Sequence, residues 1–154
     1  IDGNAWTEDV WSWAKKHPSC KVIMVRGVAS EAAPLLQRVA KERGRTGKLL
    51  AYSRRFFNFA TSVLKWSTYR DLVKTDPLER GFIDLPHGLA DEYYQQLTSE
   101  ARKEVRNKRT GVIEHRWVQD PNIRNEALDT FNQAEAAWVR LSELPCGSWR
   151  ATRK

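Results

Sequence analysis

The sequence predicts a single α/β domain, and three observations support this. Helix and strand signals alternate along the chain. Its 154 residues suit one globular domain with its own core. The composition is 41% hydrophobic and 29% charged, as in a folded rather than a disordered protein. No apolar run approaches the roughly 20 residues that a membrane-spanning helix needs, so a transmembrane protein is excluded.

The first elements are a strand end, a short helix and a buried strand. Residues 1–4 are expected to leave a strand and enter a loop. Thr7 is predicted to cap a short helix with acids in its first turn, and Pro18 to stop it. Residues 21–27 predict a buried strand, because four consecutive apolar residues there include two Val and one Ile.

The middle of the chain is predicted to alternate loop, strand and helix. Residues 28–47 have little periodicity and many small and basic side chains, which indicates a long, mobile loop. Strand-like apolar runs follow at residues 48–53 and 54–60. Thr61 then caps a predicted helix with an apolar face of Leu64, Tyr69, Leu72 and Val73.

The region after residue 80 combines short elements with a hairpin. Residues 81–85 predict a short strand closed by Pro86, and residues 91–97 a helix with Tyr94 and Leu97 inward. Residues 103–118 predict a β-hairpin that turns at Lys-Arg-Thr-Gly, residues 108–111. A helix over residues 101–109 is the competing prediction, because that stretch has no β-branched run.

A long helix is expected from Pro121 and Asn122 to about Leu144. At about 100° per residue, its apolar side chains gather on one side, with Asp129 nearly opposite. The predicted core-facing residues are Ala127, Leu128, Phe131, Ala134, Trp138 and Leu141. Alone, Asp129 is an ordinary polar-face residue, since Mg²⁺ sites need further carboxylates. The acid with the most comparable placement is Asp2, at a strand end beside a glycine.

Positive charge is concentrated in two runs. Residues 38–55 hold seven basic side chains and one acid, and residues 102–109 hold five basic side chains and one acid. Basic runs beside glycine-containing loops suit a polyanion, because each neutralised phosphate releases counterions. A solvated surface is the alternative for either run alone.

The sequence contains neither a metal-binding cysteine motif nor a nucleotide-binding Walker motif. Cys20 and Cys146 have no metal-ligand spacing and suggest a reducing compartment, although the sequence leaves open whether they pair. Residues 44–48, Gly-Arg-Thr-Gly-Lys, lack the spacing of a Walker motif and a Ser or Thr after the lysine.

Five sequence blocks carry a family resemblance. They are residues 1–3 with Thr7, then 22–27, 82–86, 91–98 and 124–129. Their order resembles the C-terminal nuclease domain of the lambda-type large terminase subunit of tailed bacteriophages. The match runs over nearly the whole chain, and Arg-Asn-Glu-Ala-Leu-Asp at residues 124–129 is its most specific block.

The resemblance implies an RNase H-like fold, a mixed sheet flanked by helices, here with an added β-hairpin. It implies a hydrolase, an endonuclease that cuts concatemeric double-stranded viral DNA during genome packaging, with Mg²⁺ or Mn²⁺ in a two-metal site. The implied partners are double-stranded DNA, the small terminase subunit and the portal protein. The implied location is the host bacterial cytoplasm, without a membrane.

The resemblance also implies site residues. Asp2 matches the acid of the family's central-strand motif and Asp129 the acid on its late helix, so both are expected to be catalytic metal ligands. Glu126, about 60° from Asp129 on the helix, is a candidate outer ligand. Asp84, at the end of the strand predicted at residues 81–85, is a candidate third carboxylate. We expect the Asp2 and Asp129 carboxylates to lie within roughly 8 Å, because paired ions lie about 3.5–4 Å apart.

Seven basic residues are candidates for contacting DNA phosphates. Arg26 stands where the family usually has Lys in a strand-end motif, which implies an altered phosphate contact. The other candidates come from the two basic runs and the last block: Arg43, Arg45, Lys48, Arg106, Arg109 and Arg124.

The family's nuclease domain begins with a further strand that carries its own acid. We therefore expect residues 1–154 to form one N-terminally incomplete nuclease domain, without the ATPase motor domain and with a third acid upstream of Ile1. Two alternatives stay open. One is a catalytically inert DNA-clamping or partner-docking module, and the other is an RNase H-like nuclease of the resolvase or transposase type.

Overall fold

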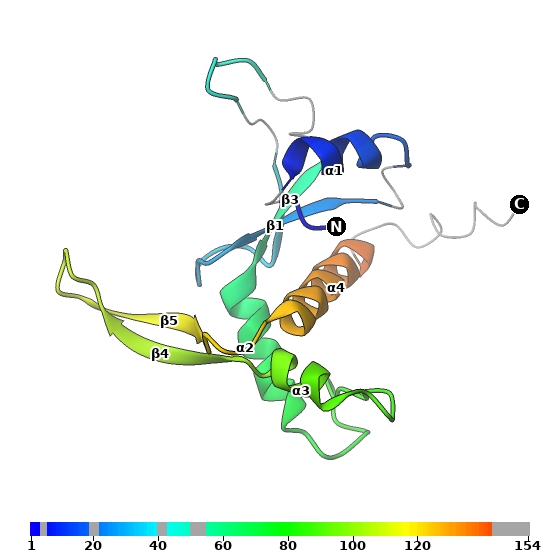
Figure 1. Ribbon diagram of the computed structural model, residues 1–154, viewed down its shortest axis with the longest axis vertical. Helices are drawn as coiled ribbons and strands as arrows, with labels where there is room; N and C mark the ends of the chain where they lie inside the picture. Colours follow the sequence, from blue (N-terminus) through cyan, green and yellow to red (C-terminus); the bar gives the residue numbers. More distant parts are fainter. Residues whose placement is uncertain (4–5, 19–21, 40–42, 50–54, 143–154) are drawn as a thin grey trace, which may run out of the picture. The chain divides into compact units, whose positions relative to one another are not determined.

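The computed structural model describes residues 1–3, 6–18, 22–39, 43–49 and 55–142 (Figure 1). The chain divides into two compact units, Ile1–Thr61 with Gln133–Lys154, and Ser62–Asn132. The described elements are a mixed three-stranded sheet, a two-stranded antiparallel hairpin and four helices. The predicted α/β class is confirmed, and this set of elements is compatible with an RNase H-like fold.

The sheet of the first unit has β3 (Phe56–Ala60) at its centre. On one side β3 pairs in parallel with β1 (Met24–Val28), and on the other it pairs antiparallel with β2 (Leu36–Arg38). The expected loop over residues 28–47 is therefore wrong in part, because it contains β2. A three-residue strand at a sheet edge is too short to show a period in its side chains.

Helix α1 (Thr7–Ala14) packs beside this sheet (Figure 1). Its Ala14 joins the fully buried side chains of Met24 and Phe56 in the core of the unit. The prediction that Thr7 is the N-cap is wrong, because Thr7 is the first helical residue. Its hydroxyl donates a hydrogen bond to the carbonyl of Gly3 (2.8 Å). Trp6 holds the cap position without a side-chain capping bond.

The second unit is built around helices. Its core contains Leu97 of α3 (Asp91–Leu97) with Ala127 and Leu128. The partly buried side chains against this core are Tyr69, Leu72, Leu85, Tyr93 and Phe131. The strand predicted at residues 81–85 is wrong, because these residues form a loop whose Leu85 packs against the helical core.

Two predicted core positions on short helices are also wrong. Val73, expected on the apolar face of α2 (Thr61–Leu72), follows the end of this helix and is 77% exposed. Tyr94 of α3 is 38% exposed, and its neighbour Tyr93 packs inward instead. Tyr93 lies four residues before Leu97, so both side chains share one helix face.

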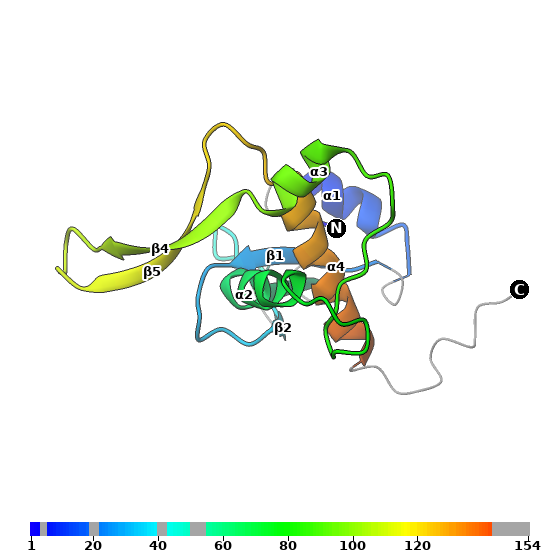
Figure 2. The same cartoon turned by 90° about the horizontal axis from the view of Figure 1, so that it is seen from below.

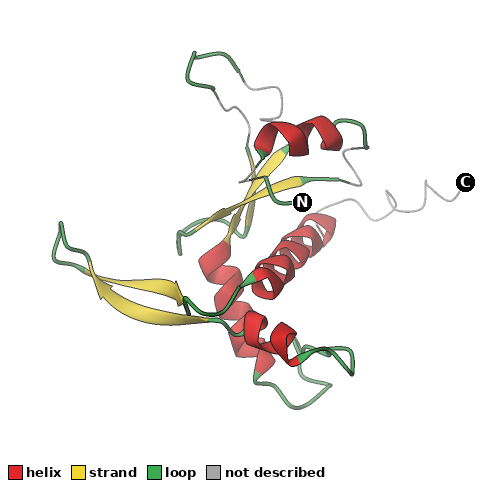
Figure 3. Cartoon of the chain, viewed as in Figure 1, coloured by secondary structure: helices red, strands yellow, loops and turns green. Residues whose placement is uncertain are grey.

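The predicted β-hairpin is confirmed, and the competing helix is wrong. Strand β4 (Glu100–Arg106) pairs antiparallel with β5 (Ile113–Gln119), as Figures 2 and 3 show. The turn forms where predicted, with Gly111 in the left-handed region at φ 73°. The side chain of Asn107 stabilises it by accepting a hydrogen bond from the amide of Arg109 (2.9 Å).

The last helix, α4 (Glu126–Ser142), begins later than predicted. The Asp120 carboxylate accepts a hydrogen bond from the Asn122 amide (2.9 Å). Pro121 and Asn122, the predicted first residues of the helix, therefore form a turn instead. Leu128 is fully buried as predicted, but Trp138 is 67% exposed. Ala134 is likewise exposed, whereas Asn132 and Ala136 are buried.

Some predictions fall on residues outside the described ranges. These are most of the strand expected at residues 48–53, both cysteines (Cys20 and Cys146) and the expected end of the last helix near Leu144.

A charged cluster ties the loop after α2 back to that helix. Asp71 lies 3.0 Å from the Arg70 Nε and 2.8 Å from the Lys74 Nζ. The Lys74 ammonium also donates to the carbonyl of Arg80 in the loop. The hydrogen bond from Arg70, together with that from Lys74, lowers the pKa of the Asp71 carboxyl to about 2.

We predict that Asp71→Asn lowers the free energy of unfolding at pH 7 by about 1 kcal/mol, allowing for screening at the exposed Arg70. The folded-state pKa is below the unfolded value, so the ionised Asp71 stabilises the protein above about pH 4. That contribution is lost as the pH falls towards 2. Urea unfolding at pH 7 and at pH 2 measures the difference in the free energy of unfolding between the variant and the wild type. An equal difference at pH 7 and pH 2 would contradict the prediction.

Candidate active site

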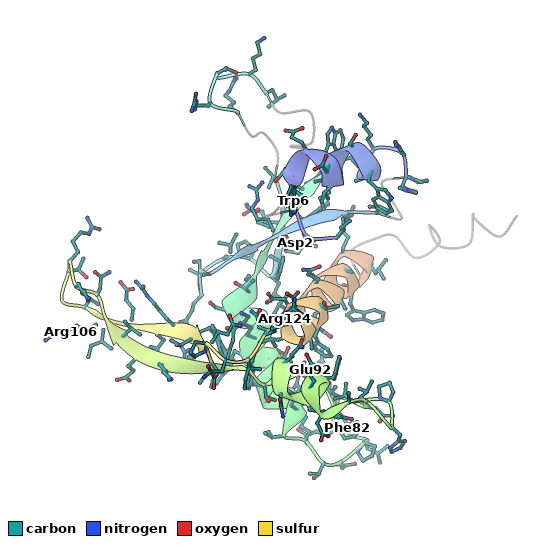
Figure 4. The ribbon with its side chains drawn as sticks, in the orientation of Figure 1. Asp2, Trp6, Phe82, Glu92, Arg106 and Arg124 are labelled. Carbon is teal, nitrogen blue, oxygen red and sulfur yellow. The ribbon has the colours of Figure 1, made fainter. Side chains whose placement is uncertain are left out.

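Asp2 lies on a segment that extends the sheet of the first unit beyond β1. It forms a parallel bridge with Val25. The Gly3 amide donates to the Val25 carbonyl (2.9 Å), and the Val25 amide donates to the Ile1 carbonyl (2.9 Å). These bonds fix the backbone on both sides of Asp2, whose side chain is exposed (Figure 4). Asp2 is thus held beside β1 by an isolated bridge, outside the named strands.

Gly3 allows the chain to pass directly over the buried ring of Phe56. A Cβ atom at Gly3 would lie 2.2 Å from the Phe56 Cε1 atom, closer than any real contact. Trp6, the N-cap residue of α1, has φ 54° and is 80% exposed. A left-handed backbone is costly for a bulky residue, and such strain is concentrated at functional sites. The approach to Phe56 constrains the backbone at Gly3, directly after Asp2.

Asp129 lies in the first turn of α4, in the second unit. Its neighbour Leu128 is fully buried, whereas the Asp129 side chain is 46% exposed. Glu126, the first residue of the helix, is more exposed, and its Oε1 lies 3.4 Å from the Nη2 of Arg124. Acids in the first turn are favoured by the helix dipole, so both carboxylates also stabilise this end of α4.

A buried ion pair lies next to Asp129. The Lys65 Nζ is 2.6 Å from the Glu100 Oε1 and 3.8 Å from the Asp129 Oδ1. The side-chain amide of Asn125 donates to the same Glu100 oxygen (2.9 Å). The side chains of Lys65 and Glu100 are 11% and 5% exposed.

Sequence reasoning did not single out Lys65 or Glu100. The available signal was the position of Lys65 on α2, three residues before Thr68 and seven before Leu72. This spacing places Lys65 on the inward stripe of the helix, where an unpaired lysine is costly. A lysine on that stripe indicates a buried carboxylate partner.

The four predicted acids are divided between the two units, with Asp84, Glu126 and Asp129 in the second. Asp84 is exposed in a loop, so its expected place at the end of a strand is wrong. Asp2 belongs to the first unit, whereas Glu126 and Asp129 belong to the second. The close approach of Asp2 and Asp129 remains a prediction. Within the described ranges, no three His, Cys, Asp or Glu side chains are grouped so that they could hold a metal ion.

The described part of the first basic run contains a tight turn at residues 43–49. The backbones of Arg43 and Leu49 form an antiparallel β-bridge, and the Gly44 amide donates a hydrogen bond to the Lys48 carbonyl (2.9 Å). The Arg43 guanidinium donates to the Gly47 carbonyl (2.7 Å), so this side chain also holds the turn together. Arg45 and Lys48 are exposed on it.

The remaining basic candidates lie on three other elements. Arg106 is exposed near the tip of the hairpin, where its Nε donates to the Gly111 carbonyl (3.1 Å; Figure 4), and Arg109 is exposed in the turn. Arg26 of β1 is half-buried, with its guanidinium 4.6 Å from the centre of the Phe56 ring. Arg124 precedes α4 and is 75% exposed.

Comparison with known protein families places the chain in one of them. The family model described as terminase large subunit gpA, endonuclease domain, matches residues 1–148. The chain belongs to this family. No curated protein and no solved structure matches the chain.

Membership of the terminase endonuclease family confirms the resemblance based on the five sequence blocks. It assigns the domain an endonuclease role in DNA packaging, acting on DNA within the terminase machinery. In the part of the chain that the structure describes, no helix is both long and apolar enough to span a membrane.

Proposed function

We propose that this terminase endonuclease domain uses Mg²⁺ or Mn²⁺ to cut both strands of concatemeric viral DNA in the cytoplasm of the bacterial host. The observation that carries the proposal is the family match over residues 1–148, which includes both Asp2 and Asp129. The half-exposed Asp129 on a helix with a buried face supports it. A carboxylate presented in this way is held in place and is still open to solvent.

The donor set fits a hard divalent cation. The residues that would hold the ions are Asp2 and Asp129, with Glu126 as an outer ligand. All three offer carboxylate oxygens, the ligands that Mg²⁺ and Mn²⁺ prefer. The side chains of Glu126 and Asp129 are 67% and 46% exposed, and Asp2 is exposed, so a hydrated ion can reach each of them. A bound divalent ion would supply an activated water and neutralise charge at the scissile phosphate.

We propose that the basic residues hold DNA by its phosphates and leave site choice to partners. Phosphate contacts fix the position of a duplex but carry no sequence information. Selection of the cutting site would then come from the small terminase subunit, and docking on the viral capsid from the portal protein.

The turn at residues 43–49 is the first candidate for a phosphate-contacting surface. We predict that replacing Arg45 and Lys48 with Ala weakens binding to all duplexes about equally. The slope of log affinity against log salt should shrink by about 0.9 for each DNA phosphate that the variant no longer neutralises. Arg43 is left in place because it holds the turn. Fluorescence anisotropy over a salt series measures both quantities.

The hairpin tip provides the matched control, with Arg106 and Arg109 replaced by Ala. An unchanged salt slope in the turn variant, together with a reduced slope in the hairpin variant, would transfer the DNA-binding role from the turn to the hairpin.

Plasmid cleavage by the complete protein tests the proposed function. We expect cleavage with Mg²⁺ or Mn²⁺ and none with a chelator. A folded protein that binds DNA and does not cut it with either ion would favour the DNA-clamping module instead. The residue-level test is the Asp129 substitution described in the Discussion.

A further inference from the structure

Lys65 connects three elements of the second unit at one point. It extends from α2 to Glu100, the first residue of β4, and to Asp129 in the first turn of α4. Lys65 and Glu100 are both buried. A buried ammonium group is tolerated only when carboxylates and hydrogen bonds compensate for its lost hydration.

The two carboxylates contact Lys65 differently. The Glu100 Oε1 lies at hydrogen-bond distance, 2.6 Å, whereas the Asp129 Oδ1 lies at 3.8 Å, an ion-pair distance without a direct hydrogen bond. Lys65 therefore attracts the Asp129 carboxylate without using its hydrogen-bonding capacity. The Asp129 side chain remains 46% exposed, so it can accept other ligands.

Glu100 is itself fixed from several sides. The Asn125 side-chain amide donates to its Oε1 (2.9 Å), and its backbone amide donates to the Tyr69 hydroxyl (3.1 Å). The ring of Tyr69 lies 5.2 Å from that of Trp117 on β5. Burial raises the pKa of the Tyr69 hydroxyl. These contacts hold Glu100 at the base of the hairpin, where it accepts the hydrogen bond from the Lys65 ammonium.

We propose that Lys65 is a positioning residue that holds the Asp129 carboxylate in its catalytic orientation, with Glu100 holding Lys65. This inference rests on the proposed function of Asp129 as a metal ligand. Groups that orient a ligating carboxylate typically change metal affinity or activity by about 10- to 100-fold when they are removed.

The test variant removes the cation and the buried charge together, as Lys65→Met with Glu100→Gln. Lys65→Met alone would leave the Glu100 carboxylate buried without its cation and endanger folding. Gln at position 100 keeps an oxygen that can accept the Asn125 hydrogen bond.

The matched control is Lys74→Met with Asp71→Asn. It removes a second lysine–carboxylate pair of the same unit, at 2.8 Å and with side chains 13% and 12% exposed. Neither residue is among those that we place in the cleavage or DNA-binding machinery. A general loss of stability should therefore affect both double variants alike.

Two measurements on the complete protein separate positioning from a purely structural role. The first is the ¹³C chemical shift of the Asp129 carboxyl carbon without metal, assigned by its loss in Asp129→Asn. We expect it to move in the Lys65 variant and to stay unchanged in the Lys74 control. The second is steady-state cleavage, in which we expect kcat to fall about 10- to 100-fold with the KM for DNA within about twofold.

An unchanged Asp129 shift, or a kcat equal to that of the Lys74 control, would overturn the positioning role while a cutting wild type still supports the nuclease. A folded wild type that binds DNA and does not cut it would overturn the proposed function, and the positioning role with it.

Discussion

Asp129→Asn should reduce the rate of metal-dependent cleavage by about 100- to 1,000-fold and leave the fold intact. Losses of this size follow from removing one group that stabilises charge in a transition state. The substitution keeps the shape of the side chain and removes the charge that a divalent ion requires. Stability should fall modestly, because the variant loses the ion pair with Lys65 and the charge that suits the helix dipole, while Leu128 still supplies the buried contact. Plasmid cleavage, with circular dichroism as the fold check, measures both effects.

Glu135→Gln on the same helix is the control for a missing carboxylate outside the proposed site, and it should cut like the wild type. Asp2→Asn is expected to lose as much activity as Asp129→Asn. If both acids hold the same ions, the double variant should be no worse than either single variant, because groups that act as a unit are not additive. An active Asp129→Asn protein would exclude Asp129 from catalysis.

Local signals predicted the elements whose geometry is determined by a few neighbouring residues. The hairpin followed from its turn at residues 108–111, which the structure confirms with Gly111 in the left-handed region. Helix α3 and strand β3 form where predicted, although the inward tyrosine of α3 is Tyr93 and not Tyr94. Strand β2 was missed, since its three residues depend on pairing with β3.

The errors have a common cause, because apolar character alone does not indicate what a side chain packs against. Residues 81–85 looked like a strand but form a loop in which Leu85 covers a helical core. In α4, the predicted apolar face includes Trp138, which is 67% exposed. The buried stripe instead passes through Leu128, Asn132 and Ala136 at four-residue spacing.

The candidate site was predictable only where local sequence blocks carry it. Asp2 and Asp129 stand in short sequence blocks. Asp129 is found on the expected helix, and Asp2 forms an isolated bridge with Val25 of β1. The interaction of Lys65 with Glu100 joins residues 35 positions apart, which no local pattern encodes. Long-range polar contacts of this kind depend on how α2 packs against the base of the hairpin.

Gly3→Ala should lower the free energy of unfolding by about 2–3 kcal/mol, the upper part of the range for overpacking a core. The new Cβ would lie 2.2 Å from the Cε1 atom of Phe56, a fully buried side chain. The backbone of Gly3 has little freedom to retreat, because its amide and carbonyl bond to Val25 and Thr7. Urea unfolding measures the decrease. Cleavage should fall as well, since any shift of Gly3 displaces the adjacent Asp2.

A smaller side chain at position 56 identifies the source of the strain. In a Phe56→Leu background, the added Gly3→Ala substitution should cost less than about 1 kcal/mol, because the atom that it would meet has been removed. This coupling between the two positions is expected only if Gly3 is required for the close approach to the ring. An equal cost of Gly3→Ala in both backgrounds would show that the glycine serves another purpose, and that Asp2 is not held in place through Phe56.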